Sequence, residues 1–233
     1  MEPCAIIDPR LPEICVKNLH KAGFKTITAP ITELVETPLS GHPDIQMFMH
    51  EKNIFVHPDI DPAFLKKIES YLNIIQCTSR LNRSYPSDVP YNIACTGTIA
   101  LHKKDSTDKC ILDYFLQKKI EIINTKQGYS KCSTLPVDDL SIITADKSIH
   151  SAAEDAGIDS LLISQGYIDL PGYNYGFIGG ASGKFLDTIY LTGPIDHHPD
   201  IERIMHFIES RGMHLKILSD KRILDAGSIF FIG

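Results

Sequence analysis

A cysteine, a histidine and an aspartate stand near the starts of predicted strands, and these residue types can together perform nucleophilic chemistry. His42 and Asp44 lie in the stretch GHPDI, and Cys132 ends the stretch KQGYSKC. A thiol becomes a nucleophile when a base takes its proton and a third group orients that base. We therefore expect Cys132 as nucleophile, His42 as base and Asp44 as the orienting carboxylate. The alternatives are structural: free cysteines often pack as small apolar side chains, and an aspartate can accept backbone amides.

A second set of residues could hold a ligand without reacting with it. Asp225 offers a carboxylate to a cation, and paired glycines allow a ligand or a backbone segment to approach closely. The predicted ligand-binding residues are Asn92, Gln127, Lys131, Gly179, Gly180 and Asp225. If the strand entries are extended, alternation places His42 and Asp44 on one face. The same alternation places Lys131 and Cys132 on opposite faces.

Metal, cofactor and phosphate sites are not expected from the sequence. The stretch GFIGGASGK fails as a phosphate loop, which needs Gly at position 178 and Ser or Thr at position 185; Ile178 and Phe185 stand there. The chain also lacks H-E-x-x-H and the Cys/His spacings of metal sites, so we expect no metal and no cofactor. The six cysteines include no Cys-x-x-Cys pair, and, with Cys132 singled out, we expect most of them to be small buried side chains in a reducing cytosol.

The composition is that of a globular protein, with 43% hydrophobic and 22% charged residues over 233 positions. We expect one domain over residues 1–233. The net charge of −6 argues against nucleic acid or an anionic membrane as a partner, because both require clustered Lys and Arg. The first residues do not resemble a secretory signal, and no apolar run approaches the ~18–20 residues that span a bilayer. We expect a cytoplasmic protein with a small-molecule ligand, and its oligomeric state stays open.

Short β-branched runs recur roughly every 45 residues, which is the spacing of a repeat architecture. Each run is followed by a helix with apolar residues at three- and four-residue spacing, and then by two further strands. The predicted helices are 11–23, 61–72, 107–119, 147–157 and 199–212, and the strands that lead into the next repeat are 44–51, 91–97, 131–137, 177–185 and 227–233. The tetrapeptide HPDI marks two helix starts, at 57–60 and 198–201, whereas its copy at 42–45 falls at a strand entry.

The fifth repeat reaches Gly233 without the strand that would complete its hairpin. The run AIIDP near the start of the chain can supply that strand, and the resulting closure removes free sheet edges. An open doubly wound sheet also alternates strands and helices, but two consecutive strands between helices fit it poorly. We therefore predict an α/β fold, a five-fold pseudosymmetric α/β propeller of ββαβ repeats closed by pairing of the N- and C-terminal strands.

This five-repeat ring resembles the pentein fold of the guanidine-modifying enzymes, which include arginine deiminase, agmatine deiminase, dimethylargininase and the amidinotransferases. The stretches GHPDI, KQGYSKC, YNYGFIGGASG and LDAGSIFFIG look like an uncharacterised family of bacterial proteins with that fold. The resemblance implies an axial channel whose walls are the entries of the third strands. It also implies a guanidino or amidino ligand held by carboxylates and attacked by a cysteine.

The chain departs from the pattern of those enzymes at the positions of their catalytic pair. Their nucleophile lies in the last repeat, where LDAGSIFFIG keeps Asp225 and Gly227 but has Ile229 or Phe231 in place of the thiol. Phe185 replaces the histidine of their H-x-D pattern. Two functions remain open. One is a cysteine-dependent hydrolase or transferase acting on a C–N bond of a small polar cation; the other is a non-catalytic ring that binds a ligand or a protein, like the ribosome anti-association factor of that fold.

Overall fold

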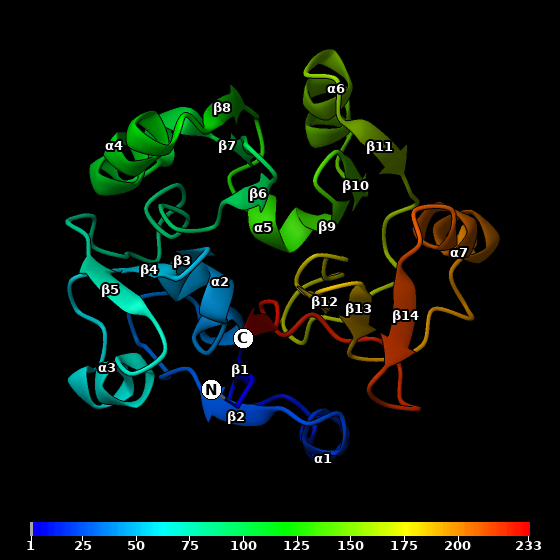
Figure 1. Ribbon diagram of the computed structural model, residues 1–233, viewed down its shortest axis with the longest axis horizontal. Helices are drawn as coiled ribbons and strands as arrows, with labels where there is room; N and C mark the ends of the chain where they lie inside the picture. The colour runs from blue at the N-terminus through cyan, green and yellow to red at the C-terminus, as the bar shows by residue number, and fades with distance from the viewer. Residues whose placement is uncertain (1) are drawn as a thin grey trace.

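The computed structural model describes residues 2–233, and over these residues five three-stranded sheets are arranged as a ring (Figure 1). Each sheet joins an antiparallel hairpin to a third, parallel strand that the chain reaches through a helix. The sheets are β15 (Phe230–Ile232) with β1 (Cys4–Ile7) and β2 (Lys25–Thr28); β3 (Met47–His50), β4 (Asn53–Val56) and β5 (Asn73–Gln76); β6 (Ala94–Thr96), β7 (Ile99–His102) and β8 (Glu121–Asn124); β9 (Thr134–Asp138), β10 (Ser141–Thr144) and β11 (Asp159–Leu162); and β12 (Ser182–Phe185), β13 (Thr188–Leu191) and β14 (His214–Ile217).

The connecting helices lie on the outside of the ring (Figure 1). They are α1 (Glu13–Lys21), α3 (Pro62–Ile68), α4 (Lys109–Lys118), α6 (Lys147–Asp155) and α7 (Ile201–Glu209). Local sequence explains several of their ends. Asp61, Asp108 and Asp146 each accept a backbone N–H of the first turn of α3, α4 and α6, which satisfies amides that have no partner inside a helix. Gly23 follows α1 with φ of 93°, a conformation that suits glycine.

The ring is closed by the two ends of the chain, as the sequence predicted. β1 pairs antiparallel with β15, with Cys4 opposite Ile232 and Ala5 opposite Phe231. β1 is fully buried and also pairs in parallel with β2, so it is the central strand of its sheet. The strands β15, β12, β9 and β6 contact one another in that order around the centre. The α/β propeller of ββαβ repeats is therefore confirmed.

Two short helical turns stand where the sequence analysis predicted extended strand entries. α2 (Pro43–Gln46) precedes β3, and α5 (Ser130–Ser133) precedes β9. The prediction that HPDI at 42–45 begins a strand is wrong, because Pro43 starts α2 with its fixed φ at the first helical position. Asp44, Lys131 and Cys132 therefore do not follow the alternation of a strand. The other two copies do lead into helices, α3 and α7.

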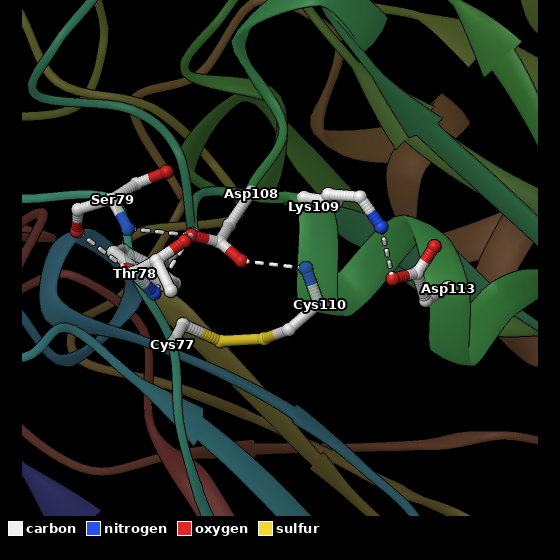
Figure 2. Close-up of a disulfide and its surroundings, with 8 residues drawn as sticks. Cys77, Thr78, Ser79, Asp108, Lys109, Cys110 and Asp113 are labelled. Carbon is white, nitrogen blue, oxygen red and sulfur yellow. Dashed lines mark hydrogen bonds and ion pairs between the residues drawn. A yellow bond between two sulfur atoms is a disulfide. The ribbon is translucent and has the colours of Figure 1, made fainter.

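The prediction that most of the cysteines are simple buried side chains is also corrected, at two positions. A disulfide joins Cys77, at the end of β5, to Cys110 in the first turn of α4 (Figure 2). The Asp108 carboxylate accepts hydrogen bonds from the backbone amides of Cys110, at 2.7 Å, and Ser79, at 2.6 Å. The segment after β5 is thus attached twice to the start of α4. Free thiols remain at Cys4, Cys15, Cys95 and Cys132.

Within residues 2–233, every helix is too short or too polar to cross a bilayer.

Candidate functional site

The turns α2 and α5 bring Asp44 and Cys132 together at the centre of the ring. The Cys132 thiol lies 3.2 Å from both carboxylate oxygens of Asp44, and it donates a hydrogen bond to that carboxylate. Cys132 is 2% exposed and Asp44 is fully buried. The direct partner of the thiol is therefore a carboxylate, whereas the sequence analysis assigned the role of base to His42.

Asn92 fixes the two turns relative to each other. Its amide nitrogen donates to the backbone oxygen of Asp44 at 2.9 Å and lies 3.1 Å from the sulfur of Cys132. Its side-chain oxygen accepts from the backbone amides of Lys131, at 2.8 Å, and Cys132, at 3.2 Å. Since Asn92 is fully buried and every polar atom of its side chain is engaged, it acts here as a positioning residue.

Ser228 completes this cluster and was missed by the sequence analysis. Its hydroxyl oxygen lies 2.7 Å from Oδ2 of Asp44 and accepts a hydrogen bond from Nζ of Lys131 at 2.9 Å. Lys131 and Cys132 thus reach the same carboxylate, although strand alternation placed them on opposite faces. Burial lowers the pKa of the Lys131 ammonium, and the nearby Asp44 opposes that shift. The sequence signal for Ser228 is its place directly after Gly227; the structure shows that both residues have positive φ.

Asp225 is held by backbone amides rather than by a cation. Its carboxylate accepts hydrogen bonds from the amides of Phe177 at 2.9 Å and Gly227 at 3.0 Å. Burial raises the pKa of Asp225 to about 6, an effect that the neighbouring His42 opposes. His42 has Nδ1 at 4.0 Å from Asp225 and Nε2 at 4.0 Å from Asp8. Nδ1 is buried without a hydrogen-bond partner.

The paired glycines are required by close packing around these groups. A Cβ atom at Gly180 would lie 2.0 Å from Oδ1 of Asp225, and one at Gly179 would lie 2.2 Å from the backbone oxygen of Lys131. The glycines therefore let the chain approach α5 and Asp225. Gln127 uses its side chain to hold the backbone: its oxygen accepts from the amide of Tyr129 at 3.0 Å, and its nitrogen donates to Asp146, at the start of α6, at 3.3 Å.

Cys132 and Asp225 share the wall of a cavity of about 280 Å³, which we call the thiol cavity. Its walls are formed by Leu39, Tyr129, Cys132, Leu170, Tyr173, Asn174, Tyr175, Phe177 and Asp225. A neighbouring cavity of about 140 Å³ shares Leu170 and Asp225 with it and reaches His42. The site is therefore a thiol and a carboxylate set behind aromatic side chains.

Burial raises the pKa of the Cys132 thiol well above its ordinary value, and the negative charges of Asp44 and Asp225 raise it further. The thiol is thus protonated when the cavity holds no cation. A positive charge bound beside it would oppose the contribution of the carboxylates and lower the pKa of the thiol.

A metal ion is a second kind of cation that the same groups could hold. Ligand atoms of His42, Asp44 and Cys132 all lie within 4.8 Å of one another, and zinc accepts these three donor types. Both oxygens of Asp44 already accept hydrogen bonds, from the thiol and from Ser228. A metal would have to displace these contacts, so the geometry fits an organic cation better.

Comparisons with known proteins support the fold. A family model described as a family of unknown function (DUF6873) matches residues 6–230, and no match was found among curated proteins. Among solved structures, DDAH from Pseudomonas aeruginosa in complex with citrulline has a TM-score of 0.53 at 9% identity, covering 93% of this chain and 92% of that one. An agmatine deiminase from C. jejuni has a TM-score of 0.52 at 9% identity, covering 84% and 70%. At these identities the likeness shows the fold, which is the predicted pentein fold.

Proposed function

The chain belongs to a family of unknown function (DUF6873) with the pentein fold, and we propose that it binds a small organic cation of the amidino or guanidino type in the thiol cavity and cleaves a C–N bond of that cation with Cys132. The observation that carries this proposal is the shared wall: Cys132 and Asp225 line one cavity, and Asp44 lies 3.2 Å from the thiol. Planar amidinium groups donate parallel hydrogen bonds that match the geometry of a carboxylate.

The charges around the cavity favour a cationic ligand. Asp44 and Asp225 are both buried, and burying a carboxylate is costly unless an opposite charge or hydrogen bonds compensate it. Lys131 contacts Asp44 through Ser228 and its charge also acts on Asp225, and His42 lies 4.0 Å from Asp225. A ligand cation beside Asp225 would place a positive charge in direct contact with its carboxylate.

The reaction then uses groups that already touch or approach the thiol. Asp44 takes the proton of the thiol, and the sulfur attacks the central carbon of the amidinium. A C–S bond forms as the π electrons of the C=N bond move to nitrogen. His42 delivers a proton to the leaving amine, and the C–N bond breaks. His42 then takes a proton from water as the water oxygen bonds to the sulfur-bound carbon. The C–S bond breaks, and the proton held by Asp44 returns to the sulfur, which releases the product and restores the thiol.

The test is to incubate the protein with a panel of amidines and guanidines, and to measure amine release and the intact mass of any adduct. Cys132→Ser should abolish both signals. The matched control is Cys15→Ser, because Cys15 is a buried free thiol that donates to the backbone oxygen of Thr192, away from the thiol cavity. Equal turnover in Cys132→Ser and the wild-type protein would contradict the proposal.

A second candidate is a ring that binds the same class of cation without reacting. The observation that favours it is the resting state of Cys132, whose thiol is protonated and engaged with Asp44. A binding ring would be stabilised by ligand, by about 2.7 kcal/mol at a concentration of ~100 times Kd. Stabilisation of this size together with a complete absence of adduct and amine release would favour this candidate over catalysis.

A further inference from the structure

The thiol cavity has largely apolar walls around one buried carboxylate, that of Asp225. Four of its residues are aromatic, namely Tyr129, Tyr173, Tyr175 and Phe177, and Leu39 adds an aliphatic surface. Among the described residues that line this cavity there is neither lysine nor arginine. From this contrast we infer that the ligand is a monocation with an uncharged, largely apolar tail, and that guanidino acids, which carry a carboxylate on the tail, are rejected. The inference rests on the proposed function.

The cations nearest to the cavity are already committed elsewhere. Arg10 borders the neighbouring cavity, where its guanidinium is bound to the carboxylate of Asp8 at 2.6 Å and 2.9 Å. The same guanidinium donates to the backbone oxygens of Thr37 and Pro38. The ammonium of Lys131 is bound to Ser228. Neither side chain is free to pair with an anionic tail.

An anionic tail would also meet the buried carboxylate of Asp225 at close range. Like charges a few ångströms apart repel strongly where little water screens them. The tail of a small guanidine cannot lie far from Asp225 in a cavity of about 280 Å³. A carboxylate on the tail would therefore be repelled by Asp225, and no lysine or arginine of the cavity lining would pair with it.

The aromatic walls are positioned to receive an apolar tail. The rings of Tyr175 and Phe177 pack edge to face with centroids 6.0 Å apart. Tyr129 packs on Tyr85 with centroids 5.9 Å apart, and its hydroxyl donates to Asp88. These contacts fix the rings before a ligand arrives, so little ordering is needed on binding. The faces of such rings also attract organic cations.

The experiment compares three guanidines of equal chain length by calorimetric titration of the wild-type protein. They are butylguanidine, 4-guanidinobutanoate and 4-guanidinobutanamide, in which the tail is apolar, anionic, and polar but neutral. We expect butylguanidine to bind at least about tenfold more tightly than the acid, which corresponds to about 1.4 kcal/mol. We expect the neutral amide to bind more tightly than the acid, because charge rather than size causes the rejection.

A gain-of-function variant tests the same inference from the other direction. Asn174 is exposed and lines the thiol cavity, so Asn174→Arg adds a cation at the wall with little risk to folding. The variant should lower the preference for butylguanidine over the acid by about tenfold. An unchanged preference contradicts the placement of the tail beside this loop.

The outcomes separate this inference from the function on which it rests. If the acid binds as tightly as butylguanidine, the inference about the tail is overturned while the cation site stands. If none of the three guanidines binds, both the proposed function and the inference fail. Tight binding of butylguanidine and the neutral amide, with weak binding of the acid, supports both.

Discussion

Asp225 should make both ligand affinity and stability depend on pH, with a magnitude that follows from its burial. The carboxyl is 3% exposed, and burial raises its pKa from 3.8 to about 6. At about 1.4 kcal/mol for each pH unit, this difference corresponds to about 3 kcal/mol. Below pH 3.8 the group is protonated in the folded and unfolded chains alike. Above pH 6 it is ionised in both, so the folded protein carries the full cost of the buried charge.

The free energy of unfolding should therefore lose up to about 3 kcal/mol from this group as the pH rises from about 4 to about 6. Asp225→Asn removes the titration, although the amide can accept only one of the two backbone N–H groups of Phe177 and Gly227. The lost hydrogen bond changes the free energy of unfolding of the variant by the same amount at every pH. The difference between wild type and variant should change by about 3 kcal/mol in favour of the variant from pH 4 to pH 7.

Ligand affinity should show the opposite trend, because a bound cation pairs with the ionised carboxylate. Butylguanidine should bind the wild-type protein about fivefold more tightly at pH 6 than at pH 5, with a plateau above about pH 7. His42 lies 4.0 Å from this carboxyl, so the comparison is made against Asp225→Asn in the same buffers. The variant should bind weakly and without this rise. A pH-independent affinity in the wild-type protein, or the same rise in the variant, would refute the reasoning.

Three further predictions concern the ring and its packing. Deletion of residues 1–9 removes β1 from the centre of its sheet, and thermal unfolding should lose cooperativity or fall well below the wild-type midpoint; an unchanged midpoint would contradict ring closure. Reduction of the Cys77–Cys110 disulfide opens a loop whose ends are 33 residues apart, and the free energy of unfolding measured by chemical denaturation should fall by about 4 kcal/mol. Cys77→Ser lacks the disulfide, so its stability should not respond to reductant. Gly179→Ala places a Cβ 2.2 Å from two backbone oxygens and should destabilise the protein far more than Gly23→Ala, where the Cβ meets nothing within 4 Å; equal melting temperatures would argue against this packing.

The ring was predictable because its signals are local and repeated. Apolar periodicity, helix caps such as Asp61 and Asp146, and the spacing of the β-branched runs all point to the same unit. Closure followed from a missing partner: the last strand needed a neighbour, and the run that contains Ala5 was unpaired. Each of these inferences depends on segments of five or more residues, which is the length that periodicity can detect.

The segments that position the site residues are shorter than this. The turns α2 and α5 each span four residues, so they show no period, and Asp44 and Cys132 were assigned to strands. Ser228 acts through a backbone with φ of 68°, which its residue type does not suggest. The contact between Cys77 and Cys110 depends on how β5 and α4 pack across the sheet, which spacing in the sequence does not encode.

The aromatic wall was missed for a different reason. Tyr173 and Tyr175 lie in the loop between β11 and β12, which has no regular structure to fix the direction of a side chain. Only the folded chain brings this loop beside Tyr129, which belongs to a different repeat.

The central claim is that Cys132 responds to an amidinium group, and its alkylation by two reagents of nearly equal shape tests this directly. Chloroacetamidine is positively charged at neutral pH, whereas chloroacetamide is neutral. Cys95 is an internal control, because it is a free thiol in the same chain whose pKa burial raises to about 12, and it lies apart from the thiol cavity. After normalisation to Cys95, Cys132 should react at least about tenfold faster with the amidine than with the amide, since hydrogen bonds to charged groups contribute about 1.5–3 kcal/mol. Equal normalised rates at Cys132, measured by mass spectrometry of the labelled peptides, would contradict the account.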